Sequence, residues 1–126
     1  MKTNNSGFTL VELMVTVAII GILSAVVYPS LSEYADRAEC TDGMDSLLEQ
    51  AGLMEEFYNV GDSYVGATLA NAASPKGYYT ISITAQTVFL YTLAAAPADT
   101  SQHTLTLNSL GVKTATGGGS NAAACW

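Results

Sequence analysis

The sequence predicts an α+β protein in which a long N-terminal helix packs on a three- to four-stranded antiparallel sheet. Three observations support this fold class: an apolar run over residues 8–28, helical spacing of apolar side chains over residues 29–58, and strand-like alternation from residue 78 onward. The chain has 126 residues, so it is expected to hold one domain. Without the apolar run, roughly a hundred residues remain to build a core.

Residues 8–28 are predicted to form a helix that can cross a bilayer. They read FTLVELMVTVAIIGILSAVVY, and Glu12 is their only charge. A spanning helix needs about 20 apolar residues, and this run meets that length. Because Gly7 stands before the run, and not after it as in a secretory signal, the run is expected to stay in the mature protein. Lys2 in the polar leader predicts that the leader faces the cytoplasm.

The stretch from Gly7 to about Ser30, G-FTLVELMVTVAIIGILSAVVYPS, closely resembles the class III signal segment of type IV pilins. The resemblance implies that a prepilin peptidase cuts between Gly7 and Phe8 and that the new amine of Phe8 is N-methylated. Both reactions act on this chain and are not activities of it.

The same resemblance implies the ladle-shaped pilin fold. Its parts would be a leader at 1–7, a transmembrane or filament-core helix at 8–28 and an extracytoplasmic globular domain at 29–126. It also implies that Gly21 and Pro29 bound a stretch of helix that loosens on assembly. Proline removes a backbone donor, which predicts a kink one turn before it, and glycine lowers helix propensity by about 1 kcal/mol relative to alanine.

Glu12 is the anomaly of the apolar run, because a lone carboxylate inside a span costs about 2.5–3.5 kcal/mol. Cleavage would create a cationic amine on Phe8, and a buried charge is tolerable when it is paired. We hypothesise that Glu12 of one subunit neutralises the Phe8 amine of a neighbour and so sets the axial register. The alternative is that Glu12 reaches the lipid headgroups from the end of the helix.

One helix is predicted from about residue 8 to 58, apolar all round in its first half and amphipathic in its second. Its acidic positions are interpreted as a solvated face in preference to a cation site, since calcium usually takes carbonyl ligands from a compact loop as well. These positions are Asp42, Asp45, Glu49 and Glu56. The apolar stripe consists of Leu31, Tyr34, Ala35, Ala38, Met44, Leu47, Ala51, Met54 and Tyr58, with Leu48 and Phe57 beside it.

Residues 59–77 are expected to form a loop with a helical turn at 67–72, and strands are expected after it. Within residues 78–84, Tyr79, Ile81 and Ile83 should face inward. A turn at Ala85-Gln86 should precede a strand over 87–95, with Val88, Leu90 and Thr92 on one side. After a loop over 95–101, HTLTLN at 103–108 should point Leu105 and Leu107 inward. A turn over 108–111 leads to a last strand, VKTAT.

Two cysteines, Cys40 and Cys125, predict one disulfide, because the count is even and the chain carries an export signal. The bridge would tie the tail to the helix and close a loop of about 85 residues. The alternative is two buried free thiols. The pattern LTLNSLGVKT…CW also resembles the PilE-type minor pilins. Members of that subgroup often carry a cysteine just before the LTL strand, where this chain has Ser101-Gln102-His103.

The charge balance argues against nucleic acid as a partner. The net charge is −7, and a phosphate-binding surface needs a basic patch. One histidine, His103, and two cysteines do not make a catalytic or zinc site, so the chain is predicted not to be an enzyme and to use no cofactor. The basic residues are Lys2, Arg37, Lys76 and Lys113.

The predicted function is a structural subunit of a type IV pilus that supports pilus assembly, adhesion or twitching motility. Its partners would be other pilin subunits, the prepilin peptidase, the assembly machinery and, before assembly, the inner membrane. There it would be single-pass with a periplasmic C-terminus, and after assembly it would lie in the extracellular pilus. The alternatives are a DNA-uptake competence pilin and a type II secretion pseudopilin. Major pseudopilins commonly carry a C-terminal calcium loop, whereas Asp99 is the last acidic residue here.

Overall fold

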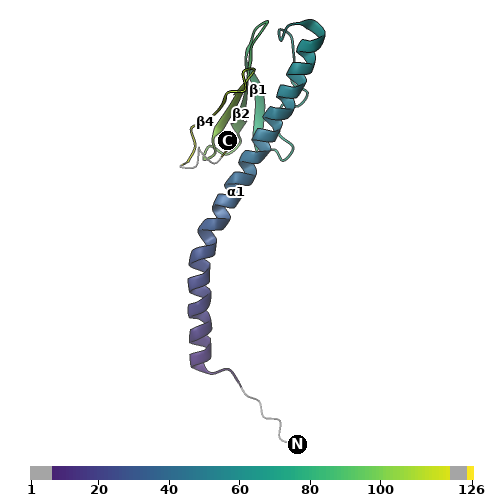
Figure 1. Ribbon diagram of the computed structural model, residues 1–126. Helices are drawn as coiled ribbons and strands as arrows, with labels where there is room; N and C mark the ends of the chain where they lie inside the picture. Colours follow the sequence, from purple (N-terminus) through teal and green to yellow (C-terminus); the bar gives the residue numbers. More distant parts are fainter. Residues whose placement is uncertain (1–6, 120–124) are drawn as a thin grey trace, which may run out of the picture. The chain divides into compact units, whose positions relative to one another are not determined.

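The computed structural model describes residues 7–119 and 125–126. Helix α1 spans Leu10–Gly61, and four strands follow it (Figure 1). The chain divides into two compact units, residues 1–35 and 36–126. The α+β prediction is confirmed. The strands are β1 (Tyr79–Gln86), β2 (Tyr91–Pro97), β3 (Thr104–Asn108) and β4 (Lys113–Thr116).

In the first unit, the apolar part of α1 is exposed. Every residue from Leu10 to Tyr28 is exposed, and the most apolar window of the helix has a mean hydropathy of 2.6. Its length and composition are sufficient to cross a membrane. Helical structure continues through Gly21 and Pro29, so any loosening of this stretch stays a prediction.

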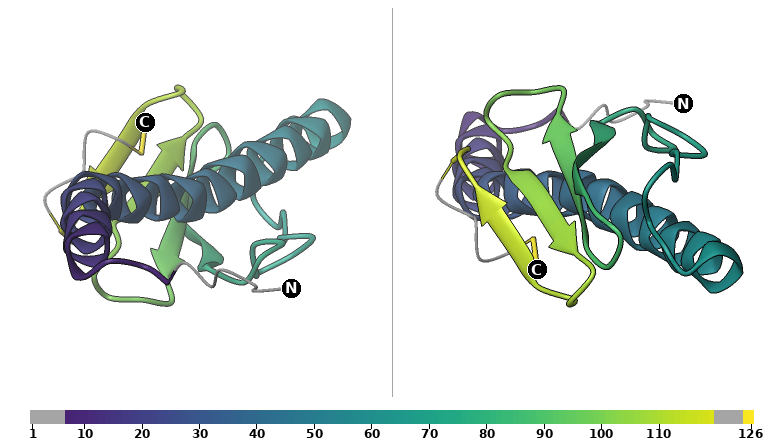
Figure 2. Two further views of the ribbon diagram at one scale, coloured as in Figure 1. Left: turned by 90° about the horizontal axis from the view of Figure 1, so that it is seen from below. Right: turned by 90° about the horizontal axis from the view of Figure 1, so that it is seen from above.

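In the second unit, α1 lies across one face of a four-stranded antiparallel sheet (Figure 2). The strand order is β1-β2-β3-β4, so each strand pairs with its neighbour along the chain. Side chains alternate between the two faces of a strand, and register pairs such as Ile81↔Ala95 and Leu93↔Leu107 place apolar residues together on the helix side.

The core forms where the amphipathic half of α1 meets the sheet. Leu47 from the helix and Leu93 and Leu105 from the strands are fully buried, and each such side chain contributes about 1.5–3 kcal/mol. The predicted inward positions in β1 and β3 are confirmed. The buried cluster comprises Cys40, Leu47, Met54, Tyr64, Ala67, Tyr79, Ile81, Tyr91, Leu93, Ala95, Leu105, Leu107 and Cys125.

The predicted phase of the second strand is wrong. The structure buries Tyr91, Leu93 and Ala95, while Val88 and Leu90 are about half exposed. The cause is the turn, which lies at Thr87–Leu90 and not at Ala85-Gln86: the Thr87 N–H donates to the Leu90 carbonyl at 2.8 Å. A shift of one residue in a strand sends every side chain to the opposite face.

Two loop predictions also need correction. No helical turn forms at 67–72; that segment is irregular and leads to a single bridge between Ala73 and Thr80. The loop expected from residue 95 begins later, because β2 continues to Pro97. Pro97 stands opposite Tyr79 at the end of the β1–β2 pair, where a missing N–H is tolerated.

The apolar stripe on α1 is only partly covered. Leu31, Tyr34 and Ala35 are exposed, and so are Leu48 and Phe57. Leu48 follows the fully buried Leu47, and because successive helix residues point about 100° apart, Leu48 lies outside the buried face.

Candidate assembly site

The assembly site begins where the chain enters α1. Gly7, Phe8 and Thr9 precede the helix, and all three are exposed, so the peptide bond between Gly7 and Phe8 is accessible to a peptidase. The Thr9 hydroxyl accepts from the Glu12 N–H at 3.2 Å, and the Thr9 carbonyl accepts from the Leu13 N–H at 3.1 Å. Thr9 is thus the N-cap of the helix.

This geometry gives Glu12 a local role that the sequence analysis missed. Thr9-x-x-Glu12 is the capping-box spacing, which could have been read directly from the sequence. Glu12 lies in the first turn, where the partial positive charge of the helix N-terminus favours a carboxylate. Whether Glu12 also pairs with the Phe8 amine of a neighbour stays a prediction, and so do the cleavage and methylation at Phe8.

The polar groups along the apolar helix are satisfied within it. The Thr16 hydroxyl donates to the Leu13 carbonyl at 2.8 Å, and the Ser24 hydroxyl donates to the Ile20 carbonyl at 2.7 Å. A polar atom in lipid or in a dry filament core must find such a partner. Glu12 is therefore the one side chain from 10 to 28 whose charge calls for an outside partner. A Cβ at Gly21 would meet nothing within 4 Å, so that position is open to a neighbouring helix.

A disulfide joins the helix to the C-terminal tail. Cys40 and Cys125 are bonded, with their Cα atoms 5.3 Å apart, and each is 2% exposed. The predicted bridge is therefore present in the structure, and it holds the end of the chain against α1. Lys2 and the other leader residues before Gly7 lie outside the described residues, as does the segment 120–124.

The glycine triplet before this bridge runs against the start of β3. The Nδ1 of His103 donates to the Gly117 carbonyl, and the Gly119 N–H donates to the Ser101 carbonyl at 2.8 Å. Gly118 has a φ of 68°, and a Cβ there would lie 2.6 Å from the Gln102 carbonyl carbon. His103 is 3% exposed, so the single histidine anchors the tail.

Trp126 completes this anchor on β4. Its indole N–H donates to the Thr114 carbonyl at 3.0 Å, and the Lys113 Nζ lies 4.8 Å from the ring centroid. That distance is within the range of a cation–π interaction. Lys113, one of the four basic residues of the chain, therefore already contacts an aromatic ring.

Glu55 ties α1 to two aromatic side chains, a contact that the sequence did not indicate. The Tyr64 hydroxyl donates to both carboxylate oxygens at 3.0 and 2.9 Å, and the Tyr91 hydroxyl donates at 3.2 Å. The Tyr64 ring lies between Tyr58, in a tilted pair, and Tyr91, in an edge-on pair, with centroid distances of 4.6 and 4.8 Å. Burial, followed by Glu55, raises the pKa of Tyr64 to about 12, and the same causes raise the pKa of Tyr91.

The predicted solvated acidic face is wrong for one of its four members. Asp42 is only 5% exposed, because the loop before β1 covers it and the Lys76 N–H donates to its Oδ1 at 3.2 Å. Among the residues that the structure describes, its Oδ2 has no hydrogen-bond partner. Asp45, Glu49 and Glu56 are exposed. In the part of the chain that the structure describes, no set of three or more His, Cys, Asp or Glu side chains is placed to hold a metal ion.

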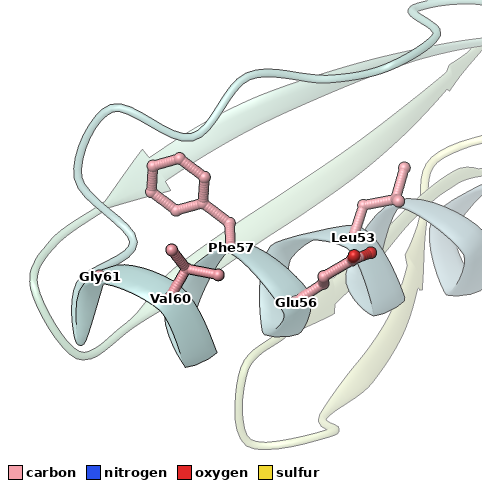
Figure 3. A pocket seen from close by; sticks show the side chains of 5 residues that line it. All are labelled: Leu53, Glu56, Phe57, Val60 and Gly61. Atoms are coloured by element: carbon pink, nitrogen blue, oxygen red, sulfur yellow. The ribbon is translucent and has the colours of Figure 1, made fainter.

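Beyond the covered face, the last turns of α1 carry an apolar groove of about 350 Å³. Figure 3 shows its lining, in which the side chains of Leu53, Phe57 and Val60 rise from the helix and Glu56 stands at the rim. Phe57 was predicted to lie beside the apolar stripe, and its side chain is 42% exposed.

Comparison with known families places this site in context. A family model described as "Type IV minor pilin ComP, DNA uptake sequence receptor" matches residues 29–106, which is more than half of the chain. A second, "Prokaryotic N-terminal methylation motif", matches residues 2–28. The two matches meet at the end of the apolar run.

Curated relatives are fimbrial proteins. The chain is 29% identical to the fimbrial protein EcpC of Eikenella corrodens over 100 residues, covering 66% of this chain and 65% of that protein. It is 39% identical over 84 residues to the type IV major pilin protein PilE1 of Neisseria gonorrhoeae, with 63% and 51% covered. It is 35% identical over 81 residues to the type IV major fimbrial protein FimA of Dichelobacter nodosus, with 61% and 52% covered. The matches thus span about half to two thirds of these relatives.

A solved structure supports the fold. The non-core minor pilin PilV of Neisseria meningitidis aligns with a TM-score of 0.60 at 20% identity, covering 71% of this chain and 94% of that one. The matched proteins are structural pilins, and the chain, like them, is not an enzyme. Its methylation-motif segment, its helix-on-sheet fold and the family match over residues 29–106 together show that the chain belongs to the type IV pilins, within the ComP minor pilin family.

Proposed function

We propose that this chain is a structural subunit of a type IV pilus. The inner membrane would hold it through α1 before assembly, with the second unit in the periplasm. The same helix would pack it into the extracellular pilus afterwards. One observation carries the proposal: from Leu10 to Tyr28, α1 is exposed on all sides. An uncovered apolar surface of this size needs lipid or other helices around it.

Processing at the start of α1 would prepare the subunit for that change of surroundings. A prepilin peptidase would cut after Gly7 and leave a cationic, N-methylated amine on Phe8. Once the helix left the bilayer, that amine and the Glu12 carboxylate would be the charges of an otherwise apolar filament core. An unpaired buried charge costs about 3–5 kcal/mol. Pairing between neighbours would remove that cost at one axial offset only.

Replacing Glu12 tests this function directly. Glu12→Gln should leave the chain anchored in the membrane but reduce its recovery in sheared pili by at least about tenfold, since 1.4 kcal/mol already corresponds to a factor of ten. Glu12→Asp keeps the charge and should assemble better than Glu12→Gln. Glu49→Gln removes an exposed carboxylate of the second unit that lies outside the groove at the end of α1 and serves as the matched control. Equal recovery of Glu12→Gln and wild-type chain would refute the pairing.

DNA uptake is the second candidate, and it is favoured by the match to a family described as a DNA uptake sequence receptor. The charges of this chain oppose it. The described cations are Arg37, Lys76 and Lys113, which lie on three different segments. Each neutralised phosphate contributes about −0.9 to the slope of log affinity against log salt for duplex DNA. Filter binding at low salt should therefore detect only weak binding, and tight binding with a steeper slope than three contacts allow would favour DNA uptake.

A further inference from the structure

The second unit carries two uncovered apolar surfaces that its own core does not use. One is the α1 groove, where Leu53, Phe57 and Val60 are 37%, 42% and 89% exposed. These positions follow the i, i+4, i+7 spacing of one helical face. The α1–β1 loop covers the same face earlier in the helix, where Gln50 Oε1 accepts from the Ala70 N–H at 3.0 Å. The groove is the part of that face that the loop leaves open.

The other surface is the β1–β2 turn. Its residues Val88, Phe89 and Leu90 are 44%, 71% and 50% exposed. The turn is held rigidly, because the Leu90 N–H donates to the Thr87 hydroxyl at 3.0 Å and the Tyr64 N–H donates to the Val88 carbonyl at 3.1 Å. A preorganised apolar projection loses little conformational entropy on binding.

Charge favours contact through these two surfaces. The chain has a net charge of −7, so the acidic domains of two copies repel each other at most points of approach. The turn from Thr87 to Leu90 carries no charge, and Glu56 is the only charged residue that lines the groove. Two copies can therefore approach closely where turn meets groove.

The two surfaces also fit the symmetry of a filament. The turn and the end of α1 lie at the same end of the second unit (Figure 1), so a contact between them would join copies side by side. Because the turn and the groove are different surfaces, the contact is heterologous, and such a contact can repeat from copy to copy along an open filament. A type IV pilin needs a contact of that kind.

We propose that the Val88–Leu90 turn of one copy seats in the Leu53–Gly61 groove of the next, with Phe89 placed against Phe57 and Val60. This inference rests on the proposed pilus function, for which it supplies a contact between neighbouring domains in addition to the packing of the apolar helices. Other occupants of the groove, such as a different pilin or a lipid surface, would give different results in the following test.

The test joins the two surfaces with engineered cysteines in the full-length chain in cell membranes. Both native cysteines are already bonded to each other, so an added thiol is the free one. A chain carrying Val60→Cys and Phe89→Cys together should give a ladder of dimers, trimers and longer species on a non-reducing gel after mild oxidation. Leu53→Cys with Leu90→Cys is a second pair, for use if the first chain does not accumulate. Val60→Cys with Val112→Cys, at a residue 52% exposed on the β3–β4 turn, is the control.

A ladder with the turn–groove pairs and little cross-linking in the control supports the contact. Dimers from Val60→Cys alone, an equal ladder in the control, or no cross-linked species from either pair would overturn it. Sheared pili from the same cells separate the two proposals. If the wild-type chain is found in pili but the cysteine pairs give no ladder, this inference alone is wrong. If the cysteine pairs give a ladder in membranes but the chain is absent from pili, the proposed pilus function is wrong.

Discussion

Gly43 is the residue at which α1 approaches the sheet most tightly among the described glycines of the helix. A Cβ at this position would lie 2.9 Å from two ring carbons of Tyr79. Tyr79 is 1% exposed, so its ring has little room to move. Close packing of this kind makes the absence of a side chain a requirement of the fold.

Gly43→Ala should therefore destabilise the protein. Overpacking costs about 1–3 kcal/mol, which exceeds the gain in helix propensity of about 1 kcal/mol. Gly52→Ala is the control, because a Cβ there would meet nothing within 4 Å, and it should be neutral or stabilising. Denaturant unfolding of the full chain in detergent measures both. A stabilising Gly43→Ala would contradict the helix–sheet spacing described above.

The two tyrosines on Glu55 predict a loss of stability at alkaline pH. The folded-state pKa of Tyr64 lies at about 12 instead of the usual 10.0, and that of Tyr91 is also raised. The folded state holds these protons more tightly than the unfolded chain does. Their contribution to stability is therefore complete below pH 10 and is lost as pH rises toward 12.

Unfolding midpoints between pH 9 and 12, a range chosen around the ordinary tyrosine pKa of about 10, should show this decline. Tyr64→Phe should make the decline shallower, and Tyr78→Phe, at an exposed position, should leave it unchanged. A midpoint that did not depend on pH in the wild-type chain would count against the Glu55 contacts.

Local sequence patterns predict the burial and contacts of some residues and not of others. Ile81 and Leu105 were predicted to be inward because strand alternation is a property of neighbouring residues. Glu55 was not identified, since its partners lie 9 and 36 residues away and no local spacing marks such a contact. Glu12 was identified from its unusual place in an apolar run. Its Thr9-x-x-Glu12 capping spacing is also visible in the sequence but was overlooked, and the Thr9 hydrogen bond shows the N-cap.

At the scale of elements, the C-terminal tail depends on its bridge to α1. The Cys40–Cys125 disulfide spans 85 residues, for which the chain-entropy relation gives about 4–5 kcal/mol. The double variant Cys40→Ser/Cys125→Ser should lose a large part of that stability. Gly118→Ala should weaken the tail's contacts with residues 101–103 while leaving the bridge itself in place.

Unfolding of both variants against the oxidised wild-type chain measures these losses. The double variant would contradict the assigned role of the bridge if its free energy of unfolding fell by less than about 1 kcal/mol, which is the size of an ordinary single substitution.

The strands show why the sequence predicts the existence of an element more reliably than its limits. The β3 alternation of leucine and threonine is unambiguous, and the prediction there is confirmed. In β2, the run VFLYTLAA is apolar in both phases, so the turn decides which phase is buried. The Thr87 hydrogen bonds that fix the turn could not be predicted, because threonine is also common in strands.

At the scale of the whole molecule, the two parts of α1 are suited to two different environments. Its residues from Leu10 to Tyr28 are exposed, and its second part supplies one side of the domain core. Hydropathy predicted this division, because it is a property of composition. The groove over Leu53–Gly61 was not predicted, since it depends on where the α1–β1 loop covers the helix, a contact between residues 20 apart in the sequence.

The most direct test of the central claim is the mass of the chain's N-terminal peptide in sheared, purified pili. The account predicts a peptide that begins at Phe8 with one methyl group on its amine. A chain that is absent from pili, or that enters pili with the residues before Phe8 still attached, would contradict it.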